Sequence, residues 1–471
     1  MNDIFKFISR SVLALVGVGL TSVCAILFLS MVAIEEFGAL GHGVGPYAGI
    51  IAYLLLPAIF VVGLILIPIG AWRTRRRDRR RIAAGQQSIQ APVVDLNQPR
   101  TRAIVLLIGV LTAVNVVIIA TATYKGVEVM ESSEFCGGAC HTVMSPQYEA
   151  YKRSPHARVR CTQCHIGPGA NWFVKSKLSG SWQLISVALD LFPRPIPTPV
   201  ENLRPARETC EQCHWPSKFV GDRLKIITHY DEDERQTEKK TVLLIKVGGI
   251  QAGTGRGIHW HVDPRNVVRY RSDKKRQHIY DVELTTDGVT RLYKAKEAPP
   301  AGAPQEPDWR TMDCVDCHNR PTHAYPQPRD EIDRVLSSGE LDRTLPYIKR
   351  EGVRIVQLKF ASHDEAGRGI RKELVDFYSQ QYPDLFKNEA QRVEEAAKKL
   401  FEIYRVNVSP EMKIDWGTYV NFQLNHDGCF RCHNADHQTE DGKRISKKCD
   451  TCHEALAEGE TAPEILDILY P

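Results

Sequence analysis

Twelve of the thirteen cysteines occur in six pairs, and a histidine follows each pair directly. The pairs with their histidines are Cys136/Cys140/His141, Cys161/Cys164/His165, Cys210/Cys213/His214, Cys314/Cys317/His318, Cys429/Cys432/His433 and Cys449/Cys452/His453. Five of the six have the spacing Cys-x-x-Cys-His, the attachment signature of c-type haem. Two thiols on one turn reach both vinyl groups of a porphyrin, and the adjacent histidine becomes the proximal iron ligand. The pattern therefore predicts covalently bound haem.

The first motif, Cys136-Gly-Gly-Ala-Cys140-His141, has one extra residue between its thiols. Gly137 and Gly138 allow the backbone to bulge there, so we count it as a sixth haem site. Structural zinc also uses Cys-x-x-Cys pairs, but each of the five repeats has a histidine directly after its second cysteine, which a zinc site does not need. A disulfide framework would not need the histidines. We therefore expect six covalently bound haem c groups.

Six irons also need ligands on their distal sides. The candidates share a short chain distance to a motif: His156, His259, His261, His323, His426 and His437. Met144, three residues after His141, is a candidate ligand for the first haem, and a thioether would raise its potential. Whether Met144 or His141 binds the first iron stays open, as does the pairing of distal ligands with haems. We interpret the more isolated histidines as surface or hydrogen-bonded residues: His42, His229, His278 and His363.

The elements that position these motifs begin with a membrane anchor over residues 1–125. Three apolar runs, Ser11–Ile34, Tyr47–Ile69 and Ala103–Thr121, are long enough to cross a bilayer as helices. A cleaved signal peptide is the alternative for the first run, but no small-residue cleavage site leads into a polar domain. Cys24 lies within this run, and we interpret it as a core or lipid-facing residue.

Positive charge is concentrated beside the second apolar run. Residues 71–102 contain nine arginines and two aspartates, whereas the whole chain has a formal net charge of only +5. This local basicity argues against nucleic-acid binding and indicates a segment retained in the cytoplasm. The sequence thus predicts a three-pass protein of the inner membrane, with a cytoplasmic N-terminus, a cytoplasmic loop at 71–102 and the haem domain on the periplasmic side.

Beyond the anchor we expect a mainly α-helical and irregular, haem-packed outer domain with a small antiparallel β insert, which makes the fold class a multihaem cytochrome c. Its parts are a three-haem region at 126–223, the β insert at 224–297, a linker with the fourth haem at 298–345, a helical scaffold at 346–424 and a two-haem segment at 425–471. Alternating and β-branched residues predict strands at 240–247, 267–271, 278–284 and 290–294. Asp287-Gly288 is typical of a hairpin turn. Helical periodicity marks 330–347 and 388–405.

The stretch Glu134–Leu191 resembles the NapC/NirT family of membrane-anchored quinol dehydrogenases. The residues that carry the resemblance, in order, are Glu134-Phe135-Cys136, Cys140-His141, Met144, Tyr151–His156, Cys161–His165, Trp172–Lys175 and Ala188–Asp190. Cys314–His318 with His323 resembles the fourth haem segment, whose trailing histidine is a distal ligand in the family. The chain departs from the family in its three apolar runs, the longer first motif, the β insert and the last two haems.

The resemblance implies oxidation of membrane quinol at the first haem and a relay of electrons to a periplasmic acceptor, such as a soluble cytochrome or a reductase. The first motif begins about fifteen residues after the third apolar run, which places it near the bilayer surface. Lys175 and Asp190 match family positions that steer the quinol hydroxyl and accept its proton; ordinary interfacial charges are the alternative. Two competing functions are a terminal reductase of a small oxyanion and a haem-bearing docking subunit without its own quinol site.

Overall fold

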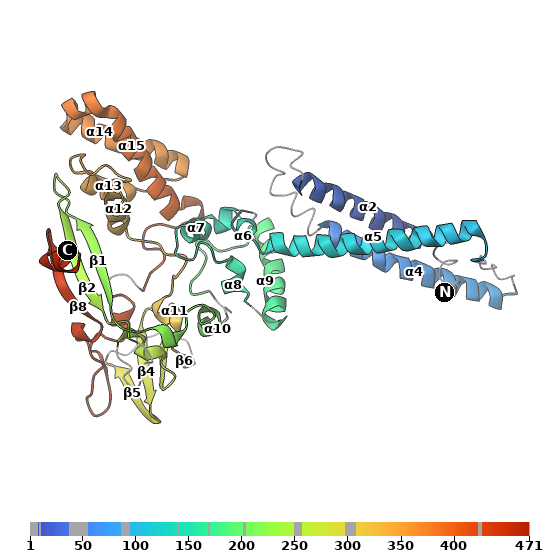
Figure 1. Cartoon of the computed structure of the whole chain (residues 1–471), viewed down its shortest axis with the longest axis horizontal. Helices are drawn as coiled ribbons and strands as arrows, with labels where there is room; N and C mark the ends of the chain where they lie inside the picture. Colours follow the sequence, from blue (N-terminus) through green and yellow to red (C-terminus); the bar gives the residue numbers. More distant parts are fainter. Residues whose placement is uncertain are drawn as a thin grey trace. The chain divides into compact units, whose positions relative to one another are not determined.

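The computed structural model describes residues 8, 11–36, 55–85, 95–138, 141–167, 170–200, 204–248, 257–296, 308–422 and 426–470. The chain forms two compact units, Met1–Ala139 and Cys140–Pro471. The boundary falls inside the first cysteine motif. The long helices of the first unit and the mixed helices and strands of the second are drawn in Figure 1.

Among its described residues, the first unit has three helices that are long and apolar enough to cross a membrane: α2 (Val12–Glu36), α4 (Leu56–Ala83) and α5 (Pro99–Met130). They match the three predicted runs, although residues 47–54 lie outside the described part. Helix α4 continues through the arginine cluster to Ala83, so the predicted loop at 71–102 begins as helix. Arginine is a good helix former, which explains why the helix does not end where the apolar run ends.

Helices α2 and α4 pack closely through small residues. A Cβ atom on Gly63 would lie 2.9 Å from Cγ2 of Thr21, and one on Gly70 would lie 2.5 Å from the backbone nitrogen of Ala14. Such close approach through glycine is typical of helix pairs in membranes. An apolar cluster that includes Cys24 and Phe28 extends the same contact. Cys24 is therefore a core residue of the helix pair.

The second unit contains two antiparallel sheets. The three-stranded sheet has the order β1 (Arg223–Tyr230), β2 (Glu238–Ile245) and β8 (His453–Glu460). The five-stranded sheet has the order β6 (Arg310–Thr311), β3 (Asn266–Ser272), β4 (Ile279–Thr286), β5 (Val289–Ala295) and β7 (His437–Gln438). The four predicted strands are present as β2 to β5, and Asp287 and Gly288 both have positive φ in the β4–β5 turn. Because β7 and β8 come from the C-terminal segment, the sheets are not a self-contained insert.

Four helices form the scaffold with the largest apolar core: α12 (Pro328–Ser337), α13 (Ile348–Val356), α14 (His363–Gln381) and α15 (Pro383–Asn407). Helices α14 and α15 lie against each other (Figure 1). The helix predicted at 330–347 ends early, because Gly339 takes a positive φ after Ser338. The helix predicted at 388–405 is part of α15.

Short helices carry the motifs and link them to the scaffold. They are α6 (Ser133–Gly138), α7 (His141–Lys152), α8 (Cys161–His165), α9 (Ala170–Ala188), α10 (Ala206–Cys210), α11 (Cys314–Cys317), and the 3-10 turns η2 (Pro216–Lys218), η4 (Ile258–Val262), η5 (Pro410–Met412), η6 (Cys429–Arg431) and η7 (Cys449–Thr451). Helix α16 (Glu464–Leu469) lies near the C-terminus. Each of the motif turns is too short to be stable alone, so the surrounding elements must hold it.

Candidate haem sites

The structure brings the histidines of five motifs next to five other histidines. The distances between ring centroids are 5.9 Å for His156–His214, 6.2 Å for His165–His323, 6.3 Å for His259–His318, 5.9 Å for His261–His433 and 5.9 Å for His426–His453. Two imidazoles that bind one metal from opposite sides, with metal–nitrogen bonds of about 2 Å, have centroids about 6 Å apart. Each pair therefore has the spacing that a six-coordinate haem iron requires.

Four of the predicted distal histidines share one hydrogen-bond pattern. Each places Nδ1 near a backbone carbonyl oxygen: Pro321 for His156 at 3.3 Å, Gln147 for His323 at 3.0 Å, Val247 for His259 at 3.1 Å and Ile258 for His261 at 2.9 Å. A carbonyl oxygen only accepts, so Nδ1 must carry the proton and donate it. This fixes the tautomer and leaves Nε2 free to bind a metal, as is usual for metal-binding histidines.

Burial favours the neutral form of five imidazoles in the histidine pairs. It is the main cause that lowers the pKa of His165, His259, His261 and His318. The pKa of His323 falls to about 4 through burial, with repulsion from His165 as the next cause. Only the neutral imidazole can donate its lone pair to a metal. Burial therefore favours the form of these five histidines that can bind iron.

His437 does not share this pattern. Its Nδ1 lies 3.3 Å from Oδ1 of Asn434, its Nε2 lies 3.1 Å from the carbonyl oxygen of Ile279, and the residue is 1% exposed. With both ring nitrogens engaged, neither is left for a metal, and we remove His437 from the ligand set. His363, expected to be an ordinary hydrogen-bonded residue, places Nε2 2.8 Å from the carbonyl oxygen of Val408.

Motifs two to six follow one another in space in the order of the sequence. The interacting thiols are Cys164 with Cys210, Cys210 with Cys314, Cys317 with Cys429, and Cys429 with Cys452. The Cys210 and Cys314 thiols are within hydrogen-bonding distance, and α10 contacts both α8 and α11. The five sites thus form a continuous series.

The two cysteines of a motif differ in how far the polypeptide covers them. In four motifs one cysteine is exposed while its partner is half-buried, and the exposed ones are Cys164, Cys213, Cys429 and Cys449. The polypeptide therefore leaves one thiol of each of these four pairs accessible.

Cys213 is the exposed cysteine of the third motif. Its backbone nitrogen donates to the carbonyl oxygen of Cys210 at 3.1 Å, which closes the turn after α10 and places the residue at the surface. The Cys213 thiol nevertheless interacts with that of Cys164, so it belongs to the same series of sites. We keep Cys213 as a proposed attachment residue, because a thiol must be accessible before it can bond to a vinyl group.

The turn η4 supplies the partners of two neighbouring motifs, through His259 and His261. It is fixed to the end of β2, because the backbone nitrogen of Ile258 donates to the carbonyl oxygen of Lys246 at 2.9 Å. Gly257, just before the turn, has a φ of 97°, and a Cβ atom there would lie 2.3 Å from the same oxygen. Glycine is therefore required at this position, and the β-sheet holds the turn that serves both sites.

Asp316, between the two cysteines of the fourth motif, links that motif to the five-stranded sheet. It is 1% exposed. Its Oδ1 accepts from the Tyr270 hydroxyl at 2.5 Å and from Nε of Arg310 at 3.1 Å, while Oδ2 accepts from the backbone nitrogen of Asp313 at 2.7 Å. Asp313 in turn accepts from the backbone nitrogen of Ala206 at 2.8 Å, which joins the third motif to the fourth.

We expect Asp316→Ala to lower the free energy of unfolding of the holoprotein by about 3 kcal/mol, because it leaves the half-buried Arg310 guanidinium and the buried Tyr270 hydroxyl without their acceptor. Tyr270→Phe removes one hydrogen bond and should cost about 1 kcal/mol. Asp450→Ala, at an exposed position within the sixth motif, is the matched control and should stay within about 0.5 kcal/mol. Denaturant unfolding followed by circular dichroism measures all three. Equal losses for Asp316→Ala and Asp450→Ala would contradict the linking role.

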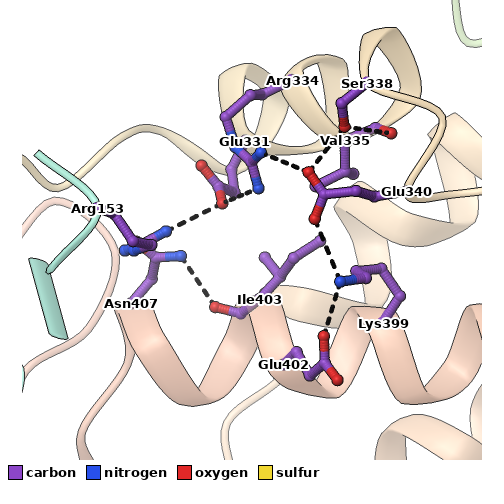
Figure 2. Close-up of polar contacts among 10 residues, drawn as sticks. All are labelled: Arg153, Glu331, Arg334, Val335, Ser338, Glu340, Lys399, Glu402, Ile403 and Asn407. Carbon is purple, nitrogen blue, oxygen red and sulfur yellow. Dashed lines mark hydrogen bonds and ion pairs between the residues drawn. The ribbon is translucent and has the colours of Figure 1, made fainter. Parts of the chain in front are cut away.

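Arg153 fastens the segment that carries His156 to the helical scaffold (Figure 2). Its guanidinium donates to Oε1 of Glu331 at 3.0 Å and to Oδ1 of Asn407 at 3.1 Å. Glu331 is 4% exposed and belongs to α12, while Asn407 ends α15. The scaffold therefore sets the position of the segment that places His156 beside His214.

The first motif is only partly described. Cys136 lies on α6, whereas Cys140 and the His141 side chain lie outside the described part. Met144, on α7, is half-buried against an apolar cluster that includes Val143 and Tyr325. The predicted iron ligands of this site therefore stay predictions.

Lys175 and Asp190 lie near opposite ends of α9. Nζ of Lys175 lies 4.7 Å from the ring centroid of Trp172, and Asp190, just after the helix, forms an ion pair with Arg194. Both side chains are exposed. The helix from Lys175 to Ala188 spans about 20 Å, so the structure does not bring the two residues together, and one quinol ring cannot contact both.

Comparison with known proteins agrees with the motif geometry. Residues 98–193 match the NapC/NirT cytochrome c family, N-terminal region. The chain belongs to this family and is a membrane-type multihaem c-type cytochrome with covalently bound haem c. It is 40% identical to the cytochrome c-type protein ImcH of Geobacter sulfurreducens over 459 aligned residues. The aligned region covers 96% of this chain and 89% of the relative. No solved structure matches the chain. The family resemblance deduced from the motifs is thereby confirmed.

Proposed function

We propose that this protein oxidises membrane quinol at its first haem site and passes the electrons through six haems to an acceptor on the periplasmic side of the inner membrane. The observation that supports the proposal most strongly is the series of five histidine pairs, each beside an attachment motif and ordered in space as in the sequence. Haem c supplies one-electron acceptance and release at such sites. The paired histidines would hold the irons, and the motif turns would set their order.

The same pairs favour electron transfer over reduction of a small oxyanion. A reductase needs an open coordination position on an iron that its substrate can reach. At five sites the described residues would supply a histidine on both sides of a haem, which would leave no position open there. We infer that the acceptor docks near the sixth motif, on η7 and β8, because this end of the series is distant in sequence from the membrane helices.

Quinol oxidation releases two protons along with two electrons, so the first site also needs a proton acceptor at the membrane surface. Asp190 offers a carboxylate that Arg194 holds in place. Lys175 offers a cation that can donate to a quinol oxygen. Because about 20 Å of helix separates them, we infer that one of the two accompanies the quinol and the other does not.

Stopped-flow reduction of the holoprotein in lipid nanodiscs by a quinol analogue tests the proposal. We expect one of the variants Lys175→Met and Asp190→Asn to slow haem reduction by about 100-fold, a typical contribution of an acid–base group. The other single variant should react at nearly the unmodified rate. The double variant should be no slower than the slower single variant.

Two controls separate the quinol site from the rest of the relay. Dithionite, which bypasses the site, should reduce all variants equally, and Lys372→Met on the scaffold helix α14 should leave the quinol rate unchanged. If both site variants keep the full rate, neither residue serves the quinol. If the unmodified protein accepts electrons from dithionite but never from quinol, it is a docking subunit and the proposed function is wrong.

A further inference from the structure

Helix α9 has an apolar stripe that faces away from the second unit. Leu178, Trp182, Ile185 and Leu189 are 70%, 60%, 49% and 64% exposed. Their spacing of four, three and four residues places them on one face of a helix. Leu189 follows the last residue of α9, but its backbone nitrogen still donates to the carbonyl oxygen of Ile185 at 3.0 Å, so the helical turn continues. The four side chains form one continuous row.

The opposite face of α9 attaches the helix to the rest of the unit. Val187 packs against the apolar cluster that includes Val143, Tyr325 and Met412, and the neighbouring Ser186 is buried. Val187 lies about half a helical turn around from Leu178 and Leu189. The orientation of the helix is thus fixed by its packed face, and the stripe points outward as a consequence.

The composition of α9 suits a lipid surface. Its charged residues are Lys175 and Lys177, with no aspartate or glutamate. Contiguous exposed leucine, isoleucine and tryptophan mark a contact surface on a folded protein. A helix with lysine and tryptophan beside an apolar row is typical of helices that lie in the interface of a membrane. Lys175, whose side chain is exposed, would meet the phosphates of anionic lipids.

A candidate membrane-spanning helix also lies close to α9 in the sequence. Helix α5, which is long and apolar enough to cross a membrane, ends at Met130, and α9 begins at Ala170. We propose that α9 lies in the plane of the membrane surface, with Leu178, Trp182 and Ile185 between the head groups and the acyl chains. The second unit would then have a membrane contact of its own. This proposed contact does not depend on quinol oxidation.

Photolabelling of the full-length holoprotein in nanodiscs tests this contact, with a carbene reagent that partitions into the acyl region. We expect labels on the stripe residues of α9 at a level comparable with the exposed Leu106 and Val117 of α5. Val289 and Leu292, exposed apolar residues of β5 in the same unit as α9, are the matched control. They should carry at least about tenfold less label, because an aqueous surface excludes a reagent that partitions into the acyl region.

The double variant Trp182→Gln/Ile185→Gln should lower the labelling of α9 at least threefold and leave that of α5 unchanged. Labelling of α9 no higher than that of β5 in the unmodified protein would overturn the proposal. If α9 is unlabelled in nanodiscs that hold two copies of the chain, the stripe would belong to a contact between the copies. This result would also overturn the proposed membrane contact.

Discussion

Replacing His323 by methionine should raise the reduction potential of one haem by on the order of 100 mV, because axial ligands set haem potentials and thioether ligation favours the reduced iron. The haem affected should be the one attached at Cys161 and Cys164. The His323 ring lies 6.2 Å from that of His165, and its Nδ1 is held by the carbonyl oxygen of Gln147. The neighbouring motif histidine, His318, pairs instead with His259.

A spectroelectrochemical titration of the purified holoprotein measures this shift. The covalent haem count should be unchanged, since attachment depends on the cysteines. His278→Met, at a histidine expected to lie on the surface, should leave every potential unaltered. His437→Met provides a stricter comparison, because His437 is buried and near the fifth motif, yet both its ring nitrogens are bonded within the protein. An unchanged titration for His323→Met, or an equal shift for His437→Met, would contradict the pairing.

Reporter fusions should show an all-or-none difference between the two sides of the membrane. A reporter joined after Gly85, just beyond α4, should be active only in the cytoplasm, and one joined at the C-terminus only outside it. Helix α4 carries its arginines beyond the apolar stretch, from Arg73 to Arg81, and such positive flanks are retained in the cytoplasm. Paired fusions to alkaline phosphatase and to a fluorescent protein that folds only in the cytoplasm give opposite readouts at each position.

A variant with the arginines at 73–81 changed to glutamine tests the cause of this orientation. It should weaken the preference and produce a mixed population, because fewer positive flanking charges remain to set the orientation. Inverted activities in the unmodified protein would place the motifs in the cytoplasm, where the proposed periplasmic acceptor could not reach them.

Local sequence patterns predicted the features that depend on neighbouring residues. The three apolar runs, the strands β2 to β5 and the Asp287-Gly288 turn all follow from short stretches of sequence. Strand β8 could not be predicted in this way, because His453–Glu460 has little intrinsic preference for a strand and forms one by pairing with β2. Helix α13 was missed because Ile348–Val356 is short, and its burial against the scaffold stabilises it.

The pairing of histidines could not be deduced from chain distance. His156 precedes the second motif yet lies beside His214 of the third. His437 follows the fifth motif closely, yet both its ring nitrogens lie within hydrogen-bonding distance of protein oxygens. The sequence analysis also missed Asp316 and Arg431, which occupy variable positions inside motifs. Arg431 donates to the carbonyl oxygen of Arg276 at 2.6 Å. A charged residue between the two cysteines of a motif, where the haem should favour apolar neighbours, was the available signal.

The number of covalent haems tests the central claim most directly. Pyridine haemochrome absorbance per chain, together with the intact mass of the denatured protein, should give six haems that resist acid-acetone extraction. The double variant Cys136→Ala/Cys140→Ala should give five, with the other sites unaffected. Five haems in the unmodified protein would remove the first motif, which is where quinol is proposed to react. Fewer than five, or a metal content dominated by zinc, would contradict the account.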